Sequence, residues 1–271
     1  MPELPEVETV RRGLAAHLIG QVVTGVVVRQ ARLRWPVPDS LALQLPGQTI
    51  RQVERRAKYL LLGTAAGTAI VHLGMTGRLC WVAADTPLRK HDHLDLLLNG
   101  GQCLRFNDSR RFGAWLWTTE PPEQHPLLRA LGPEPFDAAF SGAYLHRCAQ
   151  GRTAAVKTFI MDHHIVVGVG NIYANEALFA ASIDPLRPAG RLTEIEWEQL
   201  AGAIRTVLTD AIRQGGTTLR DFVGSRGEPG YFQQRLCVYD RYRDPCPRCG
   251  EPIQRCRIGQ RASYYCPRCQ R

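Results

Sequence analysis

The sequence lacks the features of exported and membrane-spanning proteins. Its first ten residues, MPELPEVETV, hold three acids and neither a basic nor an apolar segment, so we expect no secretory signal. Long apolar runs are also missing, because the longest uncharged stretch, residues 59–77, contains a histidine, three threonines and four glycines. We expect strands and turns there rather than a membrane span. No internal repeat or low-complexity segment is present, which leaves an ordinary globular protein.

Cysteine usage and charge narrow the class further. Nine cysteines is an odd number, and without a signal segment a disulfide framework is not expected, so reduced thiols in the cytoplasm fit best. The 271 residues, 44% of them hydrophobic, suffice for one large or two modest domains. The formal net charge of +9 favours a polyanionic partner such as a nucleic acid.

The first half of the chain has the pattern of a β-rich domain that follows one helix. Apolar residues at helical spacing predict a helix over residues 4–19, which Gly20 ends. Short apolar runs bounded by turn residues then predict strands, and Asn99-Gly100-Gly101 predicts a hairpin turn between two of them. Such closely spaced strands favour a β-sandwich or barrel. The expected strands are residues 22–28, 59–62, 68–73, 94–98, 103–106 and 114–117.

The second half is helical and ends in a cysteine-rich tail. Residues 120–136 contain five prolines and predict a linker with one short helix. Helical patterns fill residues 141–214, where Thr193 and Glu196 form a capping-box pattern for a long amphipathic helix. We therefore expect a β domain over 1–131, a linker and the start of the helical domain over 132–150, the rest of the helical domain over 151–236 and a metal-binding tail over 237–271.

The tail carries the most specific local signal in the chain. Two CxxC pairs separated by 16 residues have the spacing of a four-cysteine zinc site. Four thiolates leave no open coordination position, so one structural zinc ion is expected rather than a catalytic one. A redox dithiol is the alternative, and two such pairs at this spacing disfavour it. The expected ligands are Cys246, Cys249, Cys266 and Cys269.

Arginines surround these cysteines. Residues 213–271 hold 12 arginines, no lysine and five acids, and arginine suits planar, bidentate phosphate contacts. Arg261 falls in the expected hairpin between the two CxxC pairs. A solvated basic surface is the plainer interpretation of these charges.

The amino terminus could also be reactive. If Met1 is removed, Pro2 carries a secondary α-amine, whose reference pKa of about 8 leaves far more of it unprotonated than a lysine with a pKa of about 10.4. Such an amine can attack an aldehyde-level carbon to give an iminium ion. Glu3 and Glu6 follow at helical spacing. From spacing alone, acids that complement a helix dipole are the simpler explanation.

A Gly-x-Gly turn precedes a helix in the segment VVGVGNIYANEALF. Backbone N–H groups at a turn and a helix start can bind phosphate, and Arg152 and Lys157 lie just upstream. A packing turn between two helices explains the glycines equally well.

Taken together, nine segments in order from residue 2 to residue 270 resemble the bacterial formamidopyrimidine-DNA glycosylases. These segments are PELPEVETV, RRAKYLLL, HLGMTG, KHDH, DSRRFGAW, VVGVGNIYANEALF, QGGTTL, GYF and QRASYYCPRCQ. Leu4 stands where the related endonuclease VIII branch typically has glycine, which favours the branch that acts on oxidised purines.

The resemblance implies an α+β protein with a helix and a two-sheet β-sandwich, then a helix–two-turn–helix domain and a zinc finger, with double-stranded DNA bound in a basic cleft. It implies a bifunctional enzyme, a DNA glycosylase and abasic-site lyase that removes 8-oxoguanine and formamidopyrimidines. Pro2 would be the nucleophile at C1′, Glu3 its acid–base partner and Glu6 a further acid. Lys58 would serve β-elimination and Arg261 phosphate binding and δ-elimination.

The resemblance also implies a set of DNA contacts. A glycosylase must flip its target nucleotide out of the stack, and Met75, Arg110 and Phe112 would fill the gap. Lys157 and Asn171 match a phosphate clamp, and residues 216–231 match a loop that covers the flipped base. Further contact positions are His72, His91 and Arg152. We expect a monomer in the bacterial cytoplasm, associated with the nucleoid.

Two alternatives remain open at this point. A zinc-ribbon protein that binds DNA without catalysis would explain the charge and the cysteines, but not an amine at Pro2 beside Glu3 and Lys58. An endonuclease VIII-like enzyme for oxidised pyrimidines would share the chemistry and differ in the lesion.

Overall fold

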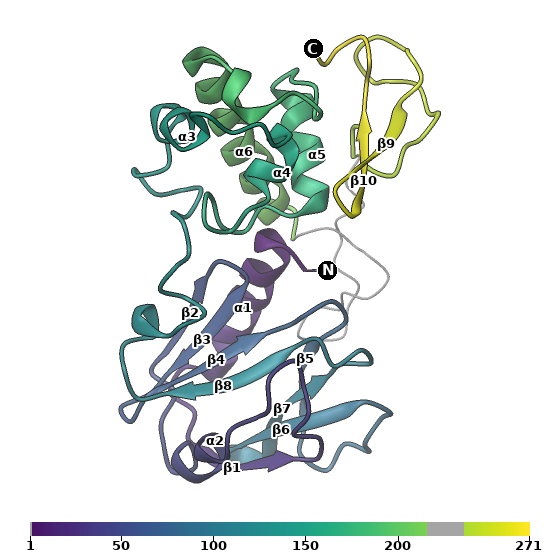
Figure 1. Ribbon diagram of the computed structural model, residues 1–271. Coiled ribbons are helices and arrows are strands. Elements are labelled where there is room, and N and C mark those ends of the chain that lie inside the picture. The colour runs from purple at the N-terminus through teal and green to yellow at the C-terminus, as the bar shows by residue number, and fades with distance from the viewer. Residues whose placement is uncertain (1, 216–235) are drawn as a thin grey trace. The chain divides into compact units, whose positions relative to one another are not determined.

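A computed structural model describes residues 2–215 and 236–271 of the chain (Figure 1). The chain divides into two compact units, one containing the described residues up to Arg129 and the other starting at Ala130 and including the C-terminal residues. The first unit contains a helix and two β-sheets, and the second contains helices and a two-stranded hairpin. This is the α+β architecture that the sequence predicts.

Two four-stranded antiparallel sheets form the sandwich of the first unit. One sheet has the order β1-β6-β7-β5 and the other has the order β2-β3-β4-β8. Asn99–Gly101 joins β6 to β7, as its Asn-Gly-Gly sequence predicts. The strands are β1 (Val23–Val28), β2 (Gln52–Arg56), β3 (Tyr59–Gly63), β4 (Thr68–His72), β5 (Arg78–Ala83), β6 (Asp92–Leu98), β7 (Gln102–Asn107) and β8 (Ala114–Thr118).

The N-terminal helix α1 (Leu4–Leu18) belongs to the core of this unit. Val7, Val10, Leu14 and Leu18 recur every three or four residues, so they lie along one face of the helix, and all four are buried. They form one hydrophobic cluster with residues of both sheets. The short helix α2 (Asp39–Gln44) adds Leu41 to the same cluster. Burial of α1 fixes the start of the chain to the sandwich.

Four helices form most of the second unit. The longest helix, α6, buries Trp197, Leu200, Ile204 and Leu208 at helical spacing, and it packs against α3 and α5. Thr193 and Glu196 make the expected reciprocal cap, with Thr193 N–H donating to Glu196 Oε2 at 2.8 Å. The helices are α3 (Gly142–Ala149), α4 (Val156–Ile160), α5 (Asn171–Ala180) and α6 (Glu194–Arg213).

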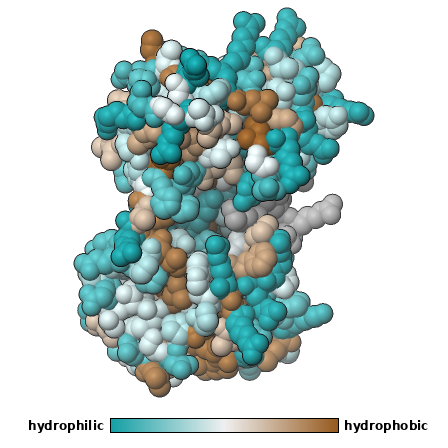
Figure 2. Space-filling view, viewed as in Figure 1, coloured by the Kyte–Doolittle hydropathy of each residue, from teal (hydrophilic) through white to brown (hydrophobic). Residues whose placement is uncertain are grey.

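The C-terminal hairpin pairs β9 (Gln254–Ile258) with β10 (Arg261–Tyr265). It packs on α5 through a small cluster that includes Phe179, Val238, Ile253 and Tyr264. Within the described ranges, no helix has both the length and the apolar character needed to span a bilayer. In the view of Figure 2, hydrophobic surface is divided into separate patches among hydrophilic side chains.

Two strands escape the sequence prediction, and both lie at the edge of a sheet. β2 buries only Val53 fully among its five residues, and β5 pairs with β7 alone. The mostly polar sequence of β2 gives it a weak apolar signal. Edge position alone does not account for the misses, because the edge strands β1 and β8 are both predicted and β5 is apolar over residues 79–83.

Candidate active site and nucleic-acid contacts

The N-terminal turn of α1 places two acids of the expected catalytic set in contact. Pro2 is buried directly before the helix, and Glu3 occupies the N-cap position. Glu3 and Glu6 form a reciprocal capping box, in which the backbone N–H of Glu3 donates to Glu6 Oε2 at 2.7 Å. Both side chains are only 2% exposed. Pro2 is therefore buried, and the two residues of the buried capping box, Glu3 and Glu6, lie one and four positions after it in the chain.

A chain of ionic and hydrogen bonds links α1 to the turn that carries Lys58. Glu8, one turn beyond the cap, accepts hydrogen bonds from Arg11, Arg12 and Arg55, and these arginines lower the pKa of Glu8 against the opposing effect of burial. Arg55 also donates to the backbone carbonyl of Ala57 at 2.9 Å. Lys58 is the next residue and is half-buried. Glu8 and Arg55 thus hold the β2–β3 turn against α1, which begins two residues after Pro2.

His72 lies at the end of β4, where the environment keeps it neutral. Its Nδ1 accepts the backbone N–H of Gly74 at 3.0 Å, so this nitrogen carries no proton. Burial lowers the pKa of His72 to about 4, and the positive charges of Arg34 and Lys58 lower it further. A neutral ring with Nδ1 occupied leaves Nε2–H as a hydrogen-bond donor.

The three expected gap-filling residues come from two adjacent turns. β4 and β8 are antiparallel neighbours, and His72 pairs with Ala114, so the turn after β4 and the turn before β8 lie at the same end of the sheet. Met75 is partly exposed on the first turn, and the exposed Arg110 and Phe112 lie on the second. The Arg110 guanidinium lies 4.6 Å from the centre of the Phe112 ring.

Asp108 joins these two turns, and the sequence analysis did not single it out. Its fully buried carboxylate accepts the Thr76 hydroxyl at 2.5 Å and the Gly113 N–H at 2.8 Å. Gly74 allows the close approach, because it has φ of 66° and a Cβ there would lie 2.3 Å from the Phe112 carbonyl carbon. The DSRRFG motif contains Asp108, but only the fold shows that its partner lies 32 residues earlier.

His91 lies beside the same assembly. It has a positive φ of 74°, and its carbonyl accepts the Asp108 N–H at 3.1 Å. The His91 and His93 rings are 6.1 Å apart, and His93 Nε2 lies 2.7 Å from the Asp108 carbonyl oxygen. Because a carbonyl only accepts, His93 donates there.

In the second unit, Lys157 is a buried cation with a defined set of partners. It is 1% exposed on α4, and its Nζ donates to Asn171 Oδ1 at 2.7 Å, to the Ala262 carbonyl at 3.0 Å and to Ser263 Oγ at 2.5 Å. Asn171 is the first residue of α5, after the N-cap Gly170. The structure therefore brings the expected Lys157–Asn171 pair together and connects it to the C-terminal hairpin.

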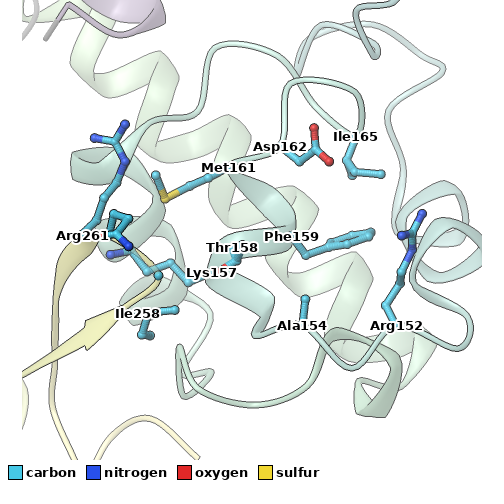
Figure 3. A pocket seen from close by; sticks show the side chains of 12 residues that line it. Arg152, Ala154, Lys157, Thr158, Phe159, Met161, Asp162, Ile165, Ile258 and Arg261 are labelled. Carbon is cyan, nitrogen blue, oxygen red and sulfur yellow. The ribbon is translucent and has the colours of Figure 1, made fainter.

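Three of the expected phosphate contacts line one open pocket of about 430 Å³ (Figure 3). In the figure, Arg152 and Arg261 lie at opposite ends of the lining, with Lys157 and Phe159 between them. Arg152 and Arg261 are exposed, and Asp162 adds the pocket's one negative side chain among the lining residues. Fixed cations around an open cavity of this kind suit a phosphate group.

The four cysteines of the tail fit a zinc ion. Their Sγ atoms all lie within 4.8 Å of one another, with Cys249 and Cys266 at 3.5 Å and Cys246 and Cys269 at 3.9 Å. Tetrahedral zinc with Zn–S bonds of about 2.3 Å needs sulfurs about 3.8 Å apart. The donor set is closed and purely thiolate, so the chain holds one structural zinc ion here.

Two polar residues of α5 attach the C-terminal segment, and both escaped the sequence analysis. The Glu176 carboxylate accepts the backbone N–H groups of residues 237–239 at 2.8 to 3.0 Å, and burial raises its pKa. Asn175 Oδ1 accepts the Tyr264 N–H of β10 at 2.7 Å. The one local signal for this role is the position of Asn175 and Glu176 in the otherwise mostly apolar sequence of α5.

Known families match each part of the chain. The formamidopyrimidine-DNA glycosylase N-terminal domain matches residues 1–115, and the helix–two-turn–helix domain of the same family matches residues 131–223. A zinc finger found in these enzymes and in isoleucyl-tRNA synthetases matches residues 243–271. These domains define a class of zinc-finger DNA glycosylases.

Whole proteins match as well. Formamidopyrimidine-DNA glycosylases of Methylococcus capsulatus and Pseudomonas aeruginosa are 60% and 58% identical to the chain, each over the full length of both sequences. The crystal structure of the Thermus thermophilus Fpg protein is 38% identical, covers 99% of this chain and 98% of its own, and has a TM-score of 0.89. A Lactococcus lactis Fpg mutant bound to DNA with a formamidopyrimidine lesion is 33% identical, covers both chains fully and has a TM-score of 0.92.

The chain belongs to the formamidopyrimidine-DNA glycosylase family. It is thus a base-excision DNA glycosylase with the family's zinc finger. The expected base-covering loop, residues 216–231, lies outside the described residues.

Proposed function

We propose that this chain removes 8-oxoguanine and formamidopyrimidines from double-stranded DNA and then cleaves the strand by β- and δ-elimination, with Pro2 as the nucleophile. The observation that carries the proposal is the buried N-terminal turn, where Pro2 is followed by Glu3 and Glu6, whose buried carboxyl groups each accept the other residue's backbone N–H. A Lactococcus lactis relative has been solved with DNA that contains a formamidopyrimidine. The substrate class agrees with the family of the chain.

Removal of Met1 exposes the secondary amine of Pro2 for the first step. The amine nitrogen bonds to C1′ of the damaged nucleoside, and the bond from C1′ to the base breaks. The base leaves with a proton, and opening of the sugar ring gives an iminium ion between Pro2 and C1′. Glu3 is placed to supply or accept the proton at the ring oxygen, because its carboxyl group is one residue from the amine and shielded from water.

The iminium ion acidifies the C2′ protons, which permits strand cleavage. Loss of one C2′ proton expels the 3′ phosphate, and a second elimination expels the 5′ phosphate. We assign Lys58 to the first elimination, since Glu8 and Arg55 hold its turn against α1. Arg261 would stabilise a departing phosphate, because it is exposed on the pocket that Lys157 lines.

The turns joined by Asp108 would fill the space left by the flipped nucleotide. Met75 and Phe112 supply apolar surface between the bases, and Arg110 supplies a hydrogen-bond donor for the orphaned cytosine. His72 and His91 would contact the DNA near the lesion, with the neutral His72 donating from Nε2. Unstacking a nucleotide costs a few kcal/mol. This cost is lower for a damaged base pair, because such a pair is less stable.

The second unit would grip the phosphate backbone. Arg152 and Arg261 provide exposed guanidinium groups at one pocket, while the buried Lys157 lines the same pocket and donates to Asn171. We place the enzyme in the cytoplasm with the bacterial nucleoid, as a monomer.

Borohydride trapping tests the proposal. A duplex with one 8-oxoguanine opposite cytosine should give a covalent complex with the mature chain and none with Pro2→Gly, with intact mass to verify loss of Met1. Tight binding without a complex in the mature chain would instead favour a DNA-binding protein without catalysis. A parallel thymine-glycol duplex separates an enzyme for oxidised purines from one for oxidised pyrimidines.

A further inference from the structure

A second group of metal-ligating side chains lies in the turn between α4 and α5, apart from the four cysteines. Asp162, His163 and His164 are consecutive and exposed, and their potential ligand atoms all lie within 4.8 Å of one another. The His163 and His164 rings are 4.2 Å apart with an angle of 38° between their planes. Neither the catalytic steps nor the zinc finger uses these side chains.

His164 is oriented in the way that metal-bound histidines usually are. Its Nδ1 lies 2.8 Å from the carbonyl oxygen of Ala130. A carbonyl can only accept, so Nδ1 carries the proton and the neutral ring presents its lone pair at Nε2. Histidines that bind metals commonly donate their other ring N–H to a carbonyl or carboxylate, which fixes the tautomer and the ring.

Asp162 is held by the same turn. Its Oδ1 accepts the backbone N–H of His164 at 2.9 Å, which fixes the carboxylate beside the two imidazoles. The backbone of the turn is fixed in addition, because the His163 carbonyl accepts the N–H of Gly132 at 2.8 Å. A Cβ at Gly132 would lie 2.7 Å from the His164 carbonyl oxygen, so this contact requires glycine. The cluster is therefore tied to the segment with which the chain enters the second unit.

We propose that Asp162, His163 and His164 bind one divalent transition-metal ion of the nickel, copper and zinc group. Two imidazole nitrogens and one carboxylate oxygen suit these ions, whereas magnesium and calcium prefer oxygen ligands alone. Three protein ligands leave positions for water, so the site differs in donors and in openness from the closed cysteine site. A bound ion would also stabilise the contact between this turn and residues 130–132, because His164 would bind the ion through Nε2 and donates to the Ala130 carbonyl through Nδ1.

The test is a titration of the full-length, untagged, zinc-loaded protein with Ni²⁺. Calorimetry should give one saturable nickel site per chain, and mass spectrometry should show that zinc is retained. His163→Ala and His164→Ala should each weaken nickel binding at least about tenfold. Asp162→Asn, which keeps an acceptor for the His164 N–H, should weaken it less.

Two controls separate this site from general effects. His146→Ala removes a partly exposed histidine of α3 that contacts Gln150, and it should leave nickel affinity unchanged. Amide exchange gives a second readout, in which nickel should slow exchange of Gly132 in the natural chain and not in His163→Ala. Equal nickel binding by the natural chain and both histidine variants would overturn the proposal, as would nickel uptake that releases zinc.

Discussion

Among the described residues, the capping box at the start of α1 differs from the one at the start of α6 in a way that separates helix stability from catalysis. The box of α6 joins Thr193 to Glu196 at the surface, and Arg187 pairs with Glu196 at 2.6 Å. The box of α1 joins Glu3 to Glu6, and both acids are buried. Threonine is a favoured N-cap residue and glutamate is not, while buried carboxyl groups are costly. A helix start selected for stability resembles that of α6, so the acids of α1 indicate another demand, which we assign to catalysis at Pro2.

Replacement of Glu3 by glutamine should give the largest difference between the two capping boxes. Gln keeps an acceptor for the cap but cannot transfer a proton, so excision of 8-oxoguanine should fall by about 10²- to 10⁴-fold. The melting temperature should change little. Single-turnover excision and thermal denaturation measure the two effects on the same preparation.

The matched variant is Thr193→Ala at the other box. It should cost about 1 kcal/mol of stability and leave excision unchanged. If Glu3→Gln and Thr193→Ala both lower stability and spare excision, the α1 box is only a helix cap.

Loss of zinc should affect the second unit and spare the first. Cys249→Ser removes one of four thiolates, and besides the metal the hairpin is stabilised by a small hydrophobic cluster that it shares with Phe179 of α5. Because β10 carries Arg261 and two of the three acceptors for Lys157, DNA affinity should fall about tenfold or more. Zinc content by mass spectrometry and fluorescence anisotropy on duplex DNA check this. Retained zinc together with retained binding would contradict the assignment.

Asp108→Ala should affect base removal more than strand cleavage. The change leaves the Thr76 hydroxyl and the Gly113 N–H without their buried acceptor, which should cost about 1 to 3 kcal/mol. Met75, Arg110 and Phe112 then lose their common support, so excision from a damaged duplex should fall more than cleavage at a pre-formed abasic site. Asp85→Ala, at an exposed turn, is the control. Equal losses on both substrates would remove the specific role of Asp108.

The sequence predicts elements whose signal is local and misses those defined by distant partners. β3 and β4 carry the continuous apolar runs 60–62 and 69–71, which predict them, whereas β2 has only Val53 among polar side chains. The cysteine spacing specifies its own ligand set within 24 residues, from Cys246 to Cys269.

The supporting polar residues have no such pattern. Asp108 binds Thr76 from 32 residues away, and Lys157 binds Ser263 from 106 residues away. Glu176 binds backbone N–H groups, which leave no trace in the identity of the residues that carry them. Only the fold assembles these contacts, so the candidate reactive residues could be proposed through the resemblance, whereas the residues that support them could not.

The salt dependence of DNA affinity distinguishes the arginines of the phosphate pocket from the proposed nucleophile Pro2. If the enzyme neutralises about six phosphates, the logarithm of its DNA affinity should fall against the logarithm of salt concentration with a slope near −5. Arg152→Ala and Arg261→Ala should each reduce the magnitude of that slope by about 1, and Pro2→Gly should leave it unchanged. Anisotropy titrations at several salt concentrations measure the slopes. A slope near zero in the natural chain would exclude phosphate contacts as the basis of binding.

The smallest expected effect on stability comes from the ion pair between Arg187 and Glu196 at the start of α6. Hydrogen bonds from Arg187 lower the pKa of Glu196 to about 2, from an ordinary value of 4.5. Because the folded-state pKa is depressed, the stabilisation is fully present above 4.5 and is lost as the pH falls toward 2. Both side chains are more than a quarter exposed, so solvent screening should limit the contribution to about 1 kcal/mol or less. Glu196→Gln keeps the cap acceptor and removes the charge.

The difference in unfolding free energy between Glu196→Gln and the natural chain should therefore narrow as the pH is lowered from about 6 to about 3. Urea denaturation at each pH measures it, and excision at neutral pH should be the same for both proteins. A difference that stays constant with pH would show that packing rather than charge stabilises this cap. Lost excision in Glu196→Gln would show that the surface box shares the function assigned to the buried one.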